Sequence, residues 1–310
     1  MCYHAADWLK RGHLQSMGKR ASTIGYALIV FAAGASYGFI VPTVKTSMLF
    51  GIYPTEFLPL QYLYALAACF VFALVRRVKW PRPASCAKMA LLGVFTGLTS
   101  ICYYQSVSLL PSAVALTLLF QYVWVSVLIE CIANRKLPER STVAAVIIVL
   151  VGTVFAAGLL EGSASSLNPL GVALGLMSAV FYALFLFFSG RICVDERPAA
   201  RATMLAVGGL VVTSIANPGC YVTDFPNPEI WPYAVLMGTL GVILPTTLIN
   251  FASPKLSTGM VSVMASSELP VGIFAAWAIV GDAPSPLTLL GAALVLAGIV
   301  VKQVFAARKE

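Results

Sequence analysis

The chain has 310 residues, of which 59% are hydrophobic and only 10% are charged, and its formal net charge is +8. This composition excludes a water-soluble globular domain. The basic residues are dispersed over short segments and form no continuous stripe, which excludes a nucleic-acid partner. A chain of this kind works inside a bilayer, with membrane lipid around it.

Apolar stretches of about 20 residues recur along the whole chain, and an α-helix needs that length to cross about 30 Å of hydrocarbon. Proline, glycine and charged residues separate these stretches, and the connections between them are short. We therefore predict an all-α polytopic membrane protein with ten transmembrane helices. The predicted spans are residues 22 to 43, 55 to 75, 85 to 106, 112 to 133, 141 to 160, 169 to 190, 199 to 217, 231 to 252, 258 to 280 and 285 to 306.

Residues 1 to 21 precede the first span and are predicted to form a cytoplasmic tail. Lys and Arg concentrate in the short loops on the cytoplasmic side of membrane proteins. With the N-terminus inside, 19 of the 20 basic residues fall on that side, and only Lys45 falls outside. One missed helix would exchange the sides of all later loops, so this asymmetry supports ten spans and two cytoplasmic termini. The start of translation, Met1 or Met17, stays open.

The two halves of the chain resemble each other when one is shifted by 146 residues. We therefore predict two five-helix repeats, residues 22 to 160 and 161 to 310. Five is odd, so the second repeat enters the membrane from the opposite side, and the repeats are inverted. Inverted repeats are typical of secondary transporters, which bind their ligand near the midplane and work by alternating access. Aligned pairs include Gly25 with Gly171, Phe39 with Phe185, Pro138 with Pro284 and Gly152 with Gly298.

Local motifs resemble those of the EamA-type transporters of the drug/metabolite transporter superfamily. The first span ends "SYGFIVPTVK", similar to the family's aromatic-Gly pair with a lysine eight positions after the aromatic, here Tyr37 and Lys45. Glu268 and Pro270 resemble a Glu/Pro pair in the ninth helix, although a leucine separates them. Gly281-Asp282 stands where the family usually has Gly-Glu. The resemblance, over about residues 22 to 306, implies ten helices, a central cavity and secondary transport, often proton-coupled export, in a cell membrane.

Glu268 lies close to the middle of its predicted span, between Thr258 and Ile279. A charged side chain there costs about 2.5 to 3.5 kcal/mol and has to face protein or water. Burial favours the protonated carboxyl group, so the side chain could exchange a proton as the cavity changes sides. Pro270 leaves the carbonyl group of Ser266 without its helical donor, which predicts a kink at the same place. The alternative is a permanently protonated Glu268 that only hydrogen-bonds a neighbouring helix.

Other polar and aromatic residues in the spans could line a cavity around Glu268, because they share helix faces. For each of them, helix-to-helix packing is the alternative. Lys45, the outward basic residue, is predicted to act in gating or at the membrane interface. The small-residue run "GAALVLAG" in the tenth span suggests a homodimer as a further partner. The candidate lining residues are Tyr37, Tyr104, Gln121, Trp124, Tyr182 and Asn250, together with Ser100, Thr117, Ser178 and Thr246.

These features predict a carrier. The charge of the cavity indicates its substrates, because a lone carboxylate among aromatic residues suits an ammonium group, by charge pairing and cation–π contact. We expect export of a small amphipathic metabolite such as an amino acid or amine, with proton coupling. The alternatives are a carrier of nucleotide-linked or phosphorylated sugars and a non-transporting scaffold or receptor. No enzyme, catalytic residue, metal site or cofactor is predicted, since no CxxC occurs and His4 and His13 lie in the tail.

Overall fold

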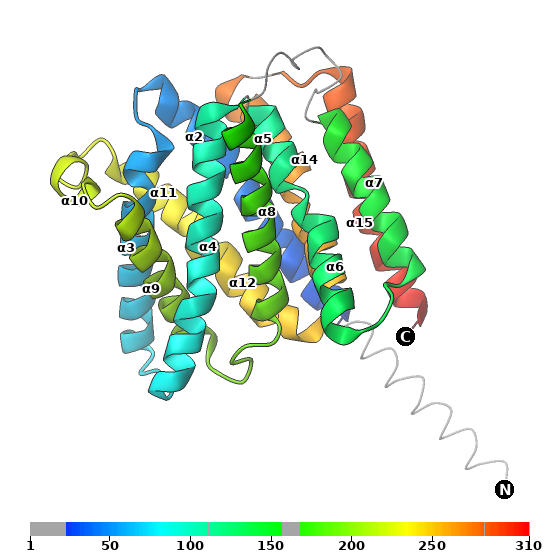
Figure 1. The fold of residues 1–310 in the computed structure, drawn as a ribbon, viewed down its shortest axis with the longest axis horizontal. Coiled ribbons are helices and arrows are strands. Elements are labelled where there is room, and N and C mark those ends of the chain that lie inside the picture. The colour runs from blue at the N-terminus through cyan, green and yellow to red at the C-terminus, as the bar shows by residue number, and fades with distance from the viewer. Residues whose placement is uncertain (1–22, 111, 157–167, 282, 310) are drawn as a thin grey trace, which may run out of the picture.

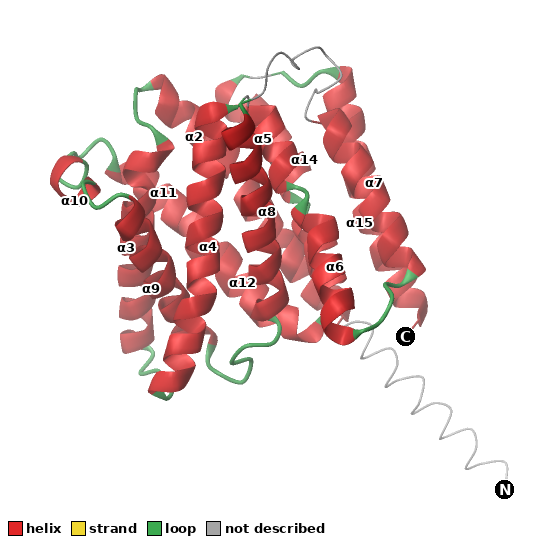
Figure 2. Ribbon diagram, in the orientation of Figure 1, coloured by secondary structure: helices red, strands yellow, loops and turns green. Residues whose placement is uncertain are grey.

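The computed structural model describes residues 23 to 110, 112 to 156, 168 to 281 and 283 to 309. These residues form helices and no strand, and the helices stand side by side in one bundle (Figures 1 and 2). The predicted tail, both candidate start residues and Asp282 lie outside the described residues. The helices are a first one over Thr23–Leu49, whose last part is α2 (Ile40–Leu49), then α3 (Pro54–Val75), α4 (Pro83–Leu109), α5 (Ser112–Leu119), α6 (Tyr122–Asn134), α7 (Arg140–Ala156), α8 (Pro169–Ser189), α9 (Pro198–Ala216), α10 (Cys220–Thr223), α11 (Trp231–Gly238), α12 (Leu244–Ala252), α13 (Thr258–Ala265), α14 (Glu268–Val280) and α15 (Pro286–Lys309).

Nine helical segments in the described residues are long and apolar enough to cross a membrane. The shorter apolar helix α7, with 17 residues, covers most of the remaining predicted span, whose last four residues lie outside the described part. The segments run up and down the bundle in alternation (Figure 1). The first helix continues past the predicted end at residue 43 to Leu49, and within this extension the hydroxyl groups of Thr43 and Thr46 donate to helix carbonyl groups one turn earlier.

Two membrane-crossing segments are broken near their middle, and the breaks are related by the repeat. Phe120 and Gln121 separate α5 from α6, and Ser266 and Ser267 separate α13 from α14. The two breaks are 146 residues apart, the shift that aligns the halves of the sequence. A third irregularity is the π-helical turn Thr239–Ile243 between α11 and α12. Interrupted helices of this kind expose backbone groups inside the bundle, where a cavity can use them.

The first helix packs directly on the break between α13 and α14. A Cβ atom at Gly38 would lie 2.9 Å from the carbonyl oxygen of Glu268, so a side chain at position 38 would push the two helices apart. Ser267 fixes the same contact, because its hydroxyl group donates to the carbonyl oxygen of Phe31 at 2.7 Å. This approach brings the residues around Gly38 next to the first turn of α14.

The small residues of α15 face α7 within the same chain. A Cβ atom at Gly291 would overlap the backbone of Ala156, and one at Gly298 would meet the carbonyl oxygen of Ala145 at 3.1 Å. The run "GAALVLAG" therefore serves packing inside the bundle. The homodimer stays a prediction, since the packing of these residues on α7 does not test it.

Candidate functional site

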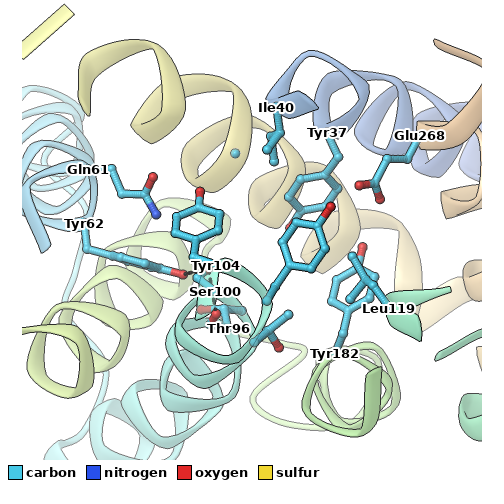
Figure 3. Close-up of a pocket in the computed structure, with 13 residues that line it drawn as sticks. Tyr37, Ile40, Gln61, Tyr62, Thr96, Ser100, Tyr104, Leu119, Tyr182 and Glu268 are labelled. Atoms are coloured by element: carbon cyan, nitrogen blue, oxygen red, sulfur yellow. Dashed lines mark hydrogen bonds between the residues drawn. The ribbon is translucent and has the colours of Figure 1, made fainter. Parts of the chain in front are cut away.

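A buried pocket lies in the middle of the bundle, between residues of the two halves of the chain (Figure 3). Its walls come from the first helix and from α3, α4, α5, α8 and α14, and from the π-helical turn. Six of its residues are tyrosine or glutamate side chains carried by the membrane spans. The lining residues are Tyr37, Ile40, Gln61, Tyr62, Thr96, Thr99, Ser100, Tyr103, Tyr104, Leu119, Tyr182, Gly241 and Glu268.

Glu268 is the charged residue of this pocket and the first residue of α14. Its exposed fraction is 7%, and no hydrogen bond or ion pair of its carboxyl group occurs within the described residues. The break places the side chain at the start of a helix, where the unpaired N–H groups favour negative charge. A buried carboxyl group in this position can bind a cation or a proton.

The kink lies where Pro270 predicts it, but the carbonyl group of Ser266 is not left free. It accepts from the backbone N–H of Leu269 at 3.2 Å, because the chain tightens at the break. The donor that Pro270 cannot supply is therefore replaced by the backbone N–H of Leu269 and not by Ser267, water or a ligand. Pro270 itself is buried in the first turn of α14 and does not line the pocket, so its contribution is the position of the break.

Tyrosine rings from different helices pack against one another beside Glu268. The ring centroids of Tyr37 and Tyr182 are 5.9 Å apart in an edge-to-face arrangement. Tyr122, which is fully buried, approaches Tyr182 at 4.6 Å in the same manner. Edge-to-face pairs fix the orientation of rings beyond what simple burial does. The result is a rigid aromatic wall on which an apolar or cationic group can lie.

The end of the pocket away from Glu268 is polar but uncharged. The hydroxyl groups of Tyr62 and Ser100 are 3.2 Å apart, and Ser100 is also placed to donate to the carbonyl oxygen of Thr96 at 3.1 Å. Gln61 is 2% exposed, and its amide points toward Tyr104 (Figure 3). Sequence reasoning missed Gln61 and Tyr62, although an amide in the middle of an apolar span is a signal of the same kind as Glu268.

Five of the predicted residues meet in the pocket, namely Tyr37, Ser100, Tyr104, Tyr182 and Glu268. Gln121 and Trp124 do not: the indole N–H of Trp124 donates to the amide oxygen of Gln121 at 2.8 Å, and Trp124 is 41% exposed. Lys45 lies on α2, close to the upper edge of the bundle in Figure 1, outside the pocket.

Asn250 is also outside the pocket, because Arg201 binds it. The guanidinium group of Arg201 donates to the carbonyl oxygen and the side-chain oxygen of Asn250, at 2.7 and 2.8 Å. It also donates to the carbonyl oxygens of Ser189 and Ile192. Arg201, which was assigned to a cytoplasmic segment, is only 2% exposed. It thus joins the C-terminal ends of α8 and α12, where negative carbonyl groups favour a cation.

A second cluster joins the two halves at the lower edge of the bundle in Figure 1. The carboxylate oxygens of Glu130, on α6, accept from the backbone N–H groups of Thr258 and Gly259 at 3.0 and 2.9 Å. Arg191 completes this contact: it lies 3.7 Å from Glu130 and donates to the Thr258 hydroxyl group at 3.1 Å. A cavity of about 500 Å³ adjoins the cluster, with Glu130 and Lys302 among its lining residues.

Comparison with known proteins identifies the family and the fold of the chain. Residues 24–158 and 169–302 each match the family model of the EamA-like transporter family. A solved crystal structure of a protein with 18% sequence identity superposes with a TM-score of 0.74, over 92% of this chain and 99% of that chain, and therefore shares the fold. The two matched segments cover most of the chain, and the chain belongs to the EamA-like transporter family of membrane proteins.

Proposed function

We propose that the protein is a secondary transporter that carries a small amphipathic metabolite, such as an amino acid or an amine, through the pocket around Glu268. One observation carries this proposal: a single buried carboxyl group lies among tyrosine rings in a pocket lined by both halves of the chain. A charge at this depth is expensive, which favours a role in binding a cation or a proton.

Alternating access follows if the two halves rock about this pocket. The halves are proposed to be inverted five-helix repeats over residues 22 to 160 and 161 to 310, ten passes in all, with both termini in the cytoplasm of a cell. The alternating direction of the segments in Figure 1 and the equivalent breaks after α5 and α13 support this arrangement. Export driven by proton uptake fits a carboxyl group that binds substrate and proton in turn.

A carrier of phosphorylated or nucleotide-linked sugars is less well supported. Phosphate groups are bound by Arg and Lys side chains or by ordered backbone N–H groups. The described lining residues include no basic side chain, and their one charge is negative. A doubly charged phosphate would therefore enter against Glu268 and without a counter-charge.

Reconstitution of the purified protein into liposomes tests the proposal. A carrier shows saturable uptake of a labelled solute and counterflow, in which unlabelled solute inside accelerates the entry of labelled solute. We expect both with at least one member of a panel of amines and amino acids. A scaffold or receptor would show neither, and the complete absence of counterflow across the panel would contradict transport of these classes.

The Glu130 contact is proposed to close the lower edge of the bundle, which is predicted to be cytoplasmic. Glu130→Ala removes the acceptors of two backbone N–H groups, and a hydrogen bond to a charged group contributes about 1.5 to 3 kcal/mol. We therefore expect the amide hydrogens of Thr258 and Gly259 to exchange with solvent about tenfold faster or more. Hydrogen–deuterium exchange of a peptide that contains Thr258 and Gly259 and starts at least two residues before Thr258 measures this effect.

Glu196→Ala is the matched control for this experiment, since Glu196 lies in the loop after α8 and has no hydrogen bond or ion pair with α13 among the described residues. Its exchange pattern in the Thr258 peptide should equal that of the wild type. Unchanged exchange in Glu130→Ala would show that other contacts keep this edge closed.

A further inference from the structure

We infer that the pocket selects a singly charged organic ammonium compound with an apolar or aryl body and a hydrogen-bond donor at its far end, and that it rejects zwitterionic amino acids. This inference rests on the proposed function and narrows its substrate class. Three features of the pocket carry it: its single charge, its polar but uncharged far end, and an amide oxygen without a partner.

The charge balance of the pocket excludes a second ionic group on the ligand. Glu268 carries the one charge among the described lining residues. An ammonium group and this carboxylate neutralise each other, so the occupied pocket has no net charge. A zwitterion would add a buried carboxylate for which the lining provides no Lys or Arg, and an unpaired buried charge is strongly unfavourable.

Three hydroxyl groups at the far end of the pocket are already engaged and do not bind such a carboxylate. The hydroxyl groups of Thr96 and Thr99 donate to the carbonyl oxygens of Gly93 and Phe95, both at 2.8 Å. Ser100 is engaged by Thr96 and Tyr62 in the same way. Because the hydrogens of these three hydroxyl groups are used inside the protein, they are not free to replace the water around an anion.

Gln61 makes the far end of the pocket suited to a ligand that donates a hydrogen bond. Its side-chain oxygen is buried and has no hydrogen-bond partner within the described residues. Leaving a buried acceptor unpaired is costly, so a ligand that brings an O–H or N–H group to it gains a hydrogen bond that the empty pocket lacks. Figure 3 places Gln61 and Glu268 on opposite sides of the pocket, with the rings of Tyr37 and Tyr104 between them.

The tyrosine rings between the two ends favour the proposed body of the ligand. Aromatic faces bind aryl groups and alkylammonium groups alike. Tyr37 and Tyr182 contact each other edge to face, and both line the pocket beside Glu268. An ammonium group near Glu268 therefore also meets aromatic rings, which adds to its binding.

Three probes separate these requirements. Tyramine has the ammonium group, the aryl body and a distal hydroxyl donor; phenethylamine lacks the hydroxyl group; tyrosine has all three features and an added carboxylate. With the full chain in lipid nanodiscs, calorimetry should show tyramine binding at least about tenfold more tightly than phenethylamine, as expected for one satisfied buried acceptor. Tyrosine should bind at least about tenfold more weakly than tyramine.

Gln61→Leu tests the role of the amide oxygen. The variant should bind tyramine and phenethylamine with the same affinity within about twofold, and it should melt no lower than the wild type, because it removes an unpaired polar group. Gln303→Leu is the matched control: Gln303, on α15, also has a buried amide oxygen without a partner within the described residues, but it does not line the pocket. This control should keep the wild-type preference for tyramine.

The inference is overturned if tyrosine binds as tightly as tyramine, or if Gln61→Leu keeps the preference for the hydroxyl group. It is also overturned if none of the three probes binds while the liposomes show counterflow of other solutes, and in that case the proposed function stands. The absence of counterflow for every solute tested with the wild-type protein would instead contradict the proposed function.

Discussion

Glu268→Gln is expected to abolish transport, with the initial rate of counterflow reduced at least about a hundredfold. Removing one partner of a buried charge pair costs about 2 to 5 kcal/mol, and a hundredfold loss corresponds to about 2.7 kcal/mol. The glutamine side chain has the same shape but cannot pair with an ammonium group or release a proton. Membrane expression should be unchanged or higher, because a neutral side chain removes the cost of a charge at this depth.

The counterflow assay in liposomes, normalised to the amount of inserted protein, measures this effect. Glu229→Gln is the matched control, since Glu229 is an exposed residue in the loop before α11, and it should transport at the wild-type rate. Wild-type counterflow in Glu268→Gln would instead mean that Glu268 is a protonated packing residue. Glu268→Asp should retain part of the activity, because it keeps the charge and withdraws it by one methylene group.

Arg201→Met is expected to cause the largest loss of stability, about 3 kcal/mol or more. The guanidinium group donates four hydrogen bonds to buried oxygens of Ser189, Ile192 and Asn250, and each bond to a charged group contributes about 1.5 to 3 kcal/mol. Methionine fills a similar volume but leaves these oxygens without donors at the ends of two helices. Part of the loss is offset, since the cost of burying the charge disappears.

Unfolding of the purified protein by a denaturing detergent, followed by circular dichroism, measures this loss as a shift of the midpoint. Arg197→Met is the control: Arg197 lies one turn earlier, is exposed, and donates no hydrogen bond to either helix end. Its midpoint should match that of the wild type. A midpoint for Arg201→Met within error of this control would show that the helix ends are held by other contacts.

The sequence determined the membrane architecture and the family because hydrophobicity and loop charge act locally. A span can be recognised from its own 20 residues, and lipid requires each span to be helical wherever it packs. The same reasoning identified Glu268, since a carboxyl group inside an apolar span is expensive regardless of its neighbours. The kink next to Pro270 likewise depends only on the missing N–H group of the proline.

The composition of the pocket depended on which helix faces meet, and no single span contains that information. Asn250 and Gln121 carry an amide side chain within a predicted span, as Gln61 does, but Arg201 binds Asn250 and Trp124 binds Gln121. The side-chain oxygen of Gln61 has no hydrogen-bond partner within the described residues. Sequence spacing gives the face of a helix on which a polar side chain lies. Only the packing of distant helices decides whether that side chain is already bound or is left for a ligand, because its partners come from segments far away in the chain.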